Sequence, residues 1–136
     1  MANLGIVVSE FHADVTERML ARAEEHAAFQ GLTVTHIVKV PGVFDMPLAL
    51  LRLIRREDVD GVVALGAVIQ GETRHDAVIM GQTARKIADL AVEYEKPIGL
   101  GITGHGQTKE QALERVEKAR EAVEAVAKLL KALDGV

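Results

Sequence analysis

The segment Gly66–Asp76 carries the side chains best suited to chemistry in this sequence. Its first part is apolar, as in a buried strand, and its second part places a glycine, a hydroxyl group and a histidine before a long helical pattern. A glycine turn that opens a helix directs backbone N–H groups and the positive end of the helix dipole at one point. Gly71, Glu72 and Thr73 therefore predict an anion site. Histidine is the side chain best suited to exchange protons near neutral pH, so His75 is the candidate for proton transfer.

These residues also have purely structural interpretations. Thr73 could serve only as the N-cap of the helix, and His75 could be an isolated surface histidine. The segment has neither the lysine of a P-loop nor the triple glycine of a dinucleotide fingerprint, so we expect no bound nucleotide. No second histidine or carboxylate lies at metal-ligand spacing from His75 on the same helix, so we expect no metal.

Two further residues follow predicted strands. Phe11 lies in a polar loop, where a large ring is favourable only if it covers something. The ring could pack on a helix or a neighbouring subunit, or it could form a platform for a planar ligand. Asp45 begins a helix, where the dipole stabilises a carboxylate in any case. We interpret His26, His36 and His105 as structural.

Four apolar runs alternate with four helical patterns along the chain. Strands are expected at Leu4–Val8, Thr33–Val40, Gly61–Ile69 and Ile98–Thr103, and helices at Ala13–Gln30, Val43–Arg56, Thr73–Glu95 and from Thr108 onward. This alternation predicts an α/β domain with a parallel sheet, in which the second strand lies at an edge and the third near the centre. Ligands of such sheets bind outside the carboxyl ends of the strands, so Phe11, Asp45 and His75 should lie together.

Composition limits the partners. With 136 residues, of which 49% are hydrophobic, we expect one domain over residues 1–136. A net charge of −4 without a basic cluster argues against nucleic acid or an anionic membrane as the main partner. The chain has no cysteine, which excludes disulfides and thiolate metal sites. Because we find no signal peptide and no apolar run of about 20 residues, we expect a cytoplasmic protein.

Three spaced motifs together resemble the lumazine synthase family. Residues 40–47 match its Val-Pro-Gly-Ala-Phe-Glu-Ile-Pro motif, residues 65–75 its Leu-Gly-x-Val-Ile-x-Gly-x-Thr-x-His motif, and residues 110–115 its Glu-Gln-Ala-x-x-Arg segment. The resemblance covers nearly the whole chain and is nearest to the archaeal branch. It implies a flavodoxin-like fold of three layers, with a four-stranded parallel sheet in the order 2-1-3-4 and helices on both faces.

The resemblance also implies a transferase of riboflavin biosynthesis that needs no cofactor. Such an enzyme condenses 5-amino-6-(D-ribitylamino)uracil with 3,4-dihydroxy-2-butanone 4-phosphate to 6,7-dimethyl-8-ribityllumazine and releases phosphate. His75 would transfer protons. By matching position, the substrate site would contain Phe11, Val43, Phe44, Asp45, Val68, Ile69 and Leu100, and the phosphate site Gly71, Glu72, Thr73 and Arg115. From the residues alone, Arg115 is simply a solvated charge.

In this family the site lies between adjacent subunits of a homopentamer, so the resemblance implies that Leu100 and Arg115 come from the neighbour. Twelve pentamers form a hollow icosahedral shell of 60 subunits in some members. Two alternatives stay open. One is the related archaeal riboflavin synthase, which shares the fold and the pentamer. The other is a shell or scaffold protein without relevant catalysis.

Overall fold

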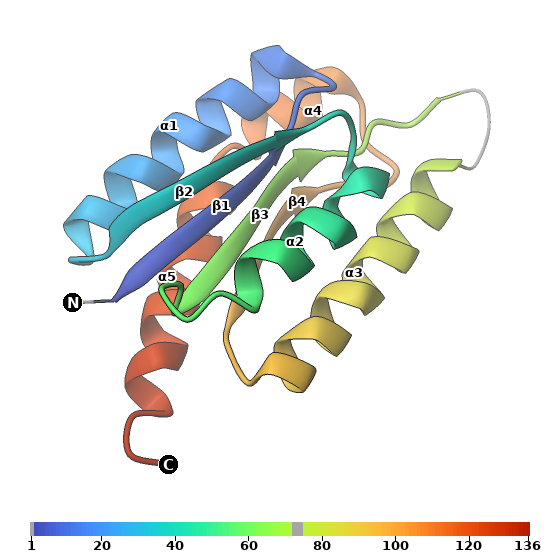
Figure 1. Ribbon diagram of the computed structural model, residues 1–136. Helices are drawn as coiled ribbons and strands as arrows, with labels where there is room; N and C mark the ends of the chain where they lie inside the picture. Colours follow the sequence, from blue (N-terminus) through green and yellow to red (C-terminus); the bar gives the residue numbers. More distant parts are fainter. Residues whose placement is uncertain (1, 72–74) are drawn as a thin grey trace.

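The computed structural model describes residues 2–71 and 75–136, which form a parallel sheet with helices on both faces (Figure 1). The strands are β1 (Asn3–Ser9), β2 (Thr33–Val40), β3 (Gly61–Ala67) and β4 (Ile98–Thr103). The helices are α1 (Ala13–Phe29), α2 (Met46–Ile54), α3 (His75–Tyr94), α4 (Lys109–Glu114) and α5 (Lys118–Ala132), and a short 3₁₀ turn, η1 (Val43–Asp45), precedes α2.

The order of the strands is β2-β1-β3-β4, which confirms the predicted order 2-1-3-4. Val7 of β1 lies between Val38 of β2 and Ala64 of β3, and Ala64 in turn lies beside Leu100 of β4. Every residue of β3 is buried, whereas β2 exposes alternate residues. The predicted central and edge strands are therefore correct.

The core has two parts, one on each face of the sheet. Alternate residues of a strand point to opposite faces, so Val8 packs towards α1 and α5 while Val7 packs towards α2 and α3. Figure 1 shows α1 and α5 on one side of the sheet and α2 and α3 on the other. The predicted three-layer α/β fold is confirmed.

Helix α5 lies very close to β4 because β4 contains glycines. A Cβ atom on Gly99 would stand 2.5 Å from the carbonyl oxygen of Ala122, and one on Gly101 would stand 3.1 Å from the Ala122 side chain. Two positions without side chains thus let the backbone of the helix rest directly on the strand.

The structure corrects the predicted final helix. Instead of one helix from Thr108 onward there are two, α4 and α5, separated by residues 115–117. Arg115 leaves the helical conformation at φ −102 and ψ 18, and the N–H groups of Lys118 and Ala119 bond three residues back. Because tight turns of this kind keep nearly helical spacing, the apolar periodicity continues through the break and did not reveal it.

Other boundaries differ less. The third strand ends at Ala67 rather than Ile69, and the helix predicted from Val43 begins as η1 before α2 continues it. Pro47 stands in the first turn of α2, where its missing N–H is harmless. The predicted start of the third helix at Thr73 lies outside the described residues.

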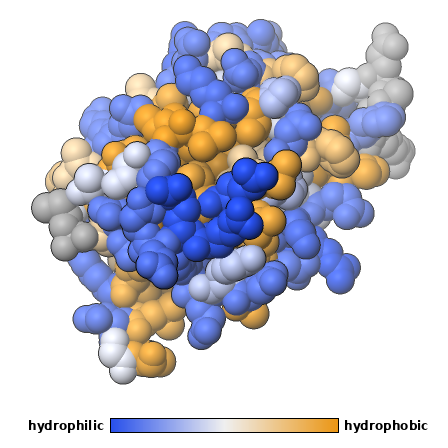
Figure 2. All heavy atoms as spheres, viewed as in Figure 1, coloured by the Kyte–Doolittle hydropathy of each residue, from blue (hydrophilic) through white to orange (hydrophobic). Residues whose placement is uncertain are grey.

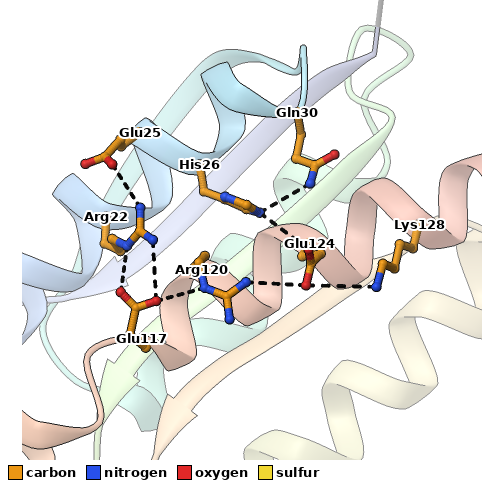
Figure 3. Close-up of polar contacts among 8 residues, drawn as sticks. All are labelled: Arg22, Glu25, His26, Gln30, Glu117, Arg120, Glu124 and Lys128. Atoms are coloured by element: carbon orange, nitrogen blue, oxygen red, sulfur yellow. Dashed lines mark hydrogen bonds and ion pairs between the residues drawn. The ribbon is translucent and has the colours of Figure 1, made fainter.

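A chain of ion pairs joins α1 to the beginning of α5 (Figure 3). Glu117 accepts hydrogen bonds from Arg22 Nε at 2.7 Å and from Arg120 Nε at 2.8 Å. These two guanidinium groups lower the pKa of Glu117 below its ordinary value. Arg22 also bonds to Glu25, and Arg120 to Glu124. The network fixes the position of α5 on α1 directly after the break.

Candidate active site

A cleft of about 220 Å³ opens at the carboxyl edge of the sheet. It is formed by the loops that follow β1, β2 and β3 together with the start of α3. These are the loops that the sequence predicts to meet. The cleft is lined by most of the predicted site residues, namely Phe11, Val43, Phe44, Asp45, Val68, Ile69, Gly71 and His75.

Phe11 forms one wall of this cleft. Its backbone N–H donates to the carbonyl oxygen of Pro41 at 2.9 Å, which ties the loop after β1 to the loop after β2. Its ring lies against Gly42, since a Cβ atom there would come within 2.8 Å of ring carbons. The side chain is nevertheless 62% exposed. The ring is therefore supported from behind and open to a ligand.

Asp45 holds the turn that carries Val43 and Phe44. Its Oδ2 accepts a hydrogen bond from the backbone N–H of Gly42 at 3.0 Å. Its Oδ1 has no hydrogen bond to any other described residue and remains available to a ligand. The hydroxyl group of Thr83, on α3, donates to the carbonyl oxygen of Val43 at 3.4 Å and so connects the turn to the helix.

The backbone after β3 distinguishes Val68 from Ile69. The N–H of Val68 donates to the carbonyl oxygen of Thr103 at 2.8 Å, and its carbonyl oxygen accepts from Gln107 Nε2 at 3.3 Å. Within the described part of the chain, the N–H and carbonyl groups of Ile69 have no such partners. Ile69 is thus the residue of this pair whose N–H can bind the edge of a ligand.

His75 is exposed at the first residue of α3 and borders the cleft. The next residue, Asp76, is buried and has a different role. Its Oδ2 accepts a hydrogen bond from the backbone N–H of Gly106 at 3.0 Å, and this bond lowers the pKa of the carboxyl group. Asp76 therefore holds the loop after β4 beside the cleft.

The predicted anion loop is described only in part. Gly71 is exposed at the rim of the cleft, while Glu72 and Thr73 lie outside the described residues.

Leu100 and Arg115 line a different cleft, formed by β4, α3 and the break between α4 and α5. Arg115 is exposed, and its Nη1 donates to Gln107 Oε1 at 2.8 Å. No described carboxylate forms an ion pair with Arg115, although Glu114 and Glu117 border the same cleft. One chain therefore presents Phe11 and Arg115 in separate clefts.

Gln107 was not found from the sequence. Its side chain is fully buried, and both of its amide atoms are hydrogen-bonded. A glutamine just before the N-cap of a short helix carries no signal of burial, because only the packing of loop 104–107 against the end of β3 makes it a core residue.

These features define a class of protein: a flavodoxin-like α/β protein with a small-molecule cleft at the carboxyl edge of its sheet. Comparison with known proteins identifies the family. Residues 1–134 match the family model described as 6,7-dimethyl-8-ribityllumazine synthase. The chain therefore belongs to the 6,7-dimethyl-8-ribityllumazine synthase family, and it is an enzyme of the transferase class.

The curated relatives carry the same name. The chain is 59% identical over 131 residues to the enzyme of Staphylothermus marinus, and the aligned residues cover 96% of this chain and 87% of the relative. It is 58% identical over 132 residues to that of Sulfolobus acidocaldarius, with 96% and 84% covered. It is 54% identical over 133 residues to that of Methanocaldococcus jannaschii, with 98% and 94% covered. The predicted resemblance is confirmed.

Proposed function

We propose that this chain condenses 5-amino-6-(D-ribitylamino)uracil with 3,4-dihydroxy-2-butanone 4-phosphate to 6,7-dimethyl-8-ribityllumazine, with loss of phosphate and water. The observation that carries the proposal is the cleft itself, which gathers an open aromatic face at Phe11, a free carboxylate oxygen at Asp45 and an exposed histidine at His75. A planar ring with a polyol chain needs the first two, and an elimination needs the third.

The aminouracil substrate would lie between the ring of Phe11 and the end of β3. The pyrimidine ring stacks on Phe11, and its polar edge bonds to the backbone of Ile69 and to the carbonyl group of Val68. The ribityl chain extends along Val43 and Phe44, and one of its hydroxyl groups donates to Asp45 Oδ1. Held in this way, the substrate presents its amine on the side of His75.

His75 would move the protons of the reaction. Imine formation, elimination of phosphate and ring closure each need a proton donor or acceptor near neutral pH, which histidine supplies. The phosphate would be bound by Gly71, Glu72 and Thr73, completed by Arg115. An anion site next to a proton carrier favours departure of the phosphate, and much of the rate should come from holding the two substrates in reactive geometry.

We propose that the complete site forms between copies of the chain, with Leu100 and Arg115 provided by a neighbour in a homopentamer. The separate cleft of Arg115 supports this arrangement. So do the exposed side chains of Phe44 and Leu48, which are 69% and 63% exposed beside the groove between α2 and α3. Figure 2 shows hydrophobic residues among the hydrophilic ones on the side of the molecule that carries α2 and α3. Whether twelve pentamers build a shell of 60 subunits is decided by sedimentation.

The alternatives are less well supported. The relatives are named as lumazine synthases and not as riboflavin synthases, which does not favour the paralogue. A scaffold without catalysis would have no need of an exposed histidine beside an open aromatic face. None of the helices in residues 2–71 and 75–136 is long and apolar enough to cross a bilayer. The cytoplasmic location remains a prediction.

The direct test is to incubate the purified chain with both substrates and to follow lumazine fluorescence together with release of inorganic phosphate. We expect equal amounts of lumazine and phosphate, with neither formed when one substrate is omitted. Absence of lumazine from a correctly folded, assembled chain would reject the proposed function. Incubation with lumazine alone tests the paralogue, which would instead form riboflavin.

A further inference from the structure

Gln107 connects the two clefts through its side chain. Its Oε1 accepts a hydrogen bond from Arg115 Nη1 at 2.8 Å, and its Nε2 donates to Thr103 Oγ1 at 2.9 Å and to the carbonyl oxygen of Val68 at 3.3 Å. Its backbone carbonyl oxygen accepts from the N–H of Gln70 at 2.8 Å. A fully buried amide with this many bonds is fixed in place, because any of them left unmade would cost desolvation energy.

The orientation of this amide follows from its partners. A guanidinium group can only donate hydrogen bonds, and a carbonyl oxygen can only accept them. The amide oxygen must therefore face Arg115 and the amide nitrogen must face Val68. Gln107 thus presents an acceptor to Arg115, while its amide nitrogen is held by the Val68 carbonyl oxygen and the Thr103 hydroxyl group.

The partner of Arg115 is neutral, which sets this arginine apart from three others. Arg22, Arg56 and Arg120 each form an ion pair with a carboxylate at 2.7–2.8 Å. Arg115 forms no ion pair within the described part of the chain, and the bond to Gln107 occupies only one of its N–H donors. The remaining donors and the full positive charge are free to meet an anion.

We propose that Gln107 is a positioning residue that aims the guanidinium group of Arg115 at the phosphate of the substrate and, being neutral, leaves its charge uncompensated. This inference rests on the proposed function, in which Arg115 binds that phosphate. A carboxylate at position 107 would also hold Arg115, but it would cancel the charge that attracts phosphate. A smaller or apolar residue would leave the long arginine side chain without a fixed direction.

The test uses Gln107→Met, which removes both amide groups at nearly constant volume. We expect the KM for 3,4-dihydroxy-2-butanone 4-phosphate to rise about tenfold, because a misaimed arginine binds phosphate poorly. The KM for the aminouracil should change less than about twofold, since only one of two acceptor positions on Val68 is involved. The dissociation constant of inorganic phosphate, measured by calorimetry, should rise in parallel.

The double variant Gln107→Met with Arg115→Ala separates positioning from a general structural role. If Gln107 acts through Arg115, replacing Gln107 should not weaken phosphate binding further once Arg115 has been replaced. The double variant should then bind phosphate with the same dissociation constant as Arg115→Ala. Gln111→Met is the matched control, because Gln111 is also a hydrogen-bonded glutamine near the start of α4. Its side chain accepts from the Thr108 N–H at 2.9 Å and caps this helix. We expect it to leave phosphate binding within about twofold of the parent chain.

The proposal would be overturned by unchanged phosphate binding in Gln107→Met, by additive effects on phosphate binding in the double variant, or by an equal loss of phosphate binding in Gln111→Met. No effect of Arg115→Ala on phosphate would remove Arg115 from the proposed site and this inference with it. A parent chain that forms no lumazine, yet binds phosphate through Arg115 and Gln107, would reject the proposed function and retain the positioning role.

Gln107→Glu keeps the test decisive if Gln107→Met does not fold. It retains an acceptor for Arg115 while adding a negative charge, so phosphate binding should weaken by about tenfold or more at neutral pH. Phosphate binding equal to that of the parent chain would refute the role of neutrality. Thermal unfolding of each variant, monitored by circular dichroism, verifies that the measured chains are folded.

Discussion

Charged side chains are used in two different ways in this molecule. On the face where α1 meets α5, carboxylates and guanidinium groups pair with one another, as Arg22, Glu117 and Arg120 do (Figure 3). At the carboxyl edge of the sheet, Asp45 and Asp76 accept from backbone N–H groups, and Arg115 donates to an amide. Charges on the first surface are cancelled, whereas charges at the second are held in place without being cancelled.

This difference distinguishes charges that hold the fold together from charges that are available to a ligand. A mutual ion pair at the surface fixes an element at small net gain, and nothing remains for a ligand. A charge held by a neutral partner keeps its field, because a hydrogen bond to an amide or a backbone N–H does not supply an opposite unit charge. The edge of the sheet is therefore prepared for a polar, charged ligand, and the α1–α5 face is complete without one.

The largest effect should come from a residue at the edge. Replacing His75 with alanine removes the proposed proton carrier, so kcat should fall by about a hundredfold or more while the assembly stays intact. Steady-state kinetics measures kcat, and sedimentation of the same preparation measures the assembly. His36→Ala is the control, because His36 lies on the outer strand β2, remote from the cleft lining. A kcat that stays at the parent value in His75→Ala would remove His75 from the mechanism.

A change beneath the α1–α5 face should affect stability and not the chemistry directly. In Gly99→Ala the new Cβ would stand 2.5 Å from the Ala122 carbonyl oxygen, so α5 must shift away from β4. Overpacking of this kind costs about 1–3 kcal/mol in the free energy of unfolding, which urea denaturation measures. Gly81→Ala, on α3, meets no atom within 4 Å and should be neutral or stabilising. A free energy of unfolding of Gly99→Ala equal to that of the parent chain would mean that α5 does not rest on β4 as described.

The two kinds of charge should also titrate differently. The pKa of Asp76 is lowered chiefly by the Gly106 N–H, and that of Glu117 by Arg22 and Arg120. For both, the stabilisation is present above the ordinary pKa of the carboxyl group and is lost as the pH falls through the lowered pKa of the folded chain. Salt screens ion pairs more than hydrogen bonds to backbone, so added salt should raise the pKa of Glu117 more than that of Asp76.

Carbon-13 NMR titration of the two carboxyl groups at low and high salt makes this comparison. Protection of the Gly106 amide proton, measured as its exchange rate relative to the intrinsic rate at each pH, should decrease as Asp76 becomes protonated. Equal salt sensitivity of the two groups would contradict the distinction between cancelled and uncancelled charges.

The residues at the carboxyl edge of the sheet could be predicted from the sequence better than the long-range hydrogen bonds that hold the neighbouring loops. The sequence predicts that Phe11, Asp45 and His75 lie together, because each follows an apolar strand pattern and parallel strands bring their carboxyl ends together. All three line one cleft in the structure. Gln107 and the role of Asp76 were not found, because a hydrogen bond across 30 or more residues leaves no local pattern. The site role of Arg115 came from the family resemblance alone.

The smallest effect should come from the surface network. Arg22→Met removes the ion pairs to Glu25 and Glu117 while keeping much of the apolar side-chain volume. Exposed pairs of this kind contribute about 0.2–1 kcal/mol each, so the urea midpoint should fall slightly and should do so less in high salt. The KM values of both substrates should stay within about twofold, because Gln107, and not this network, aims Arg115. A large rise in the KM for the phosphorylated substrate would show that the position of α5 also directs Arg115, and that the two uses of charge are coupled through the break between α4 and α5.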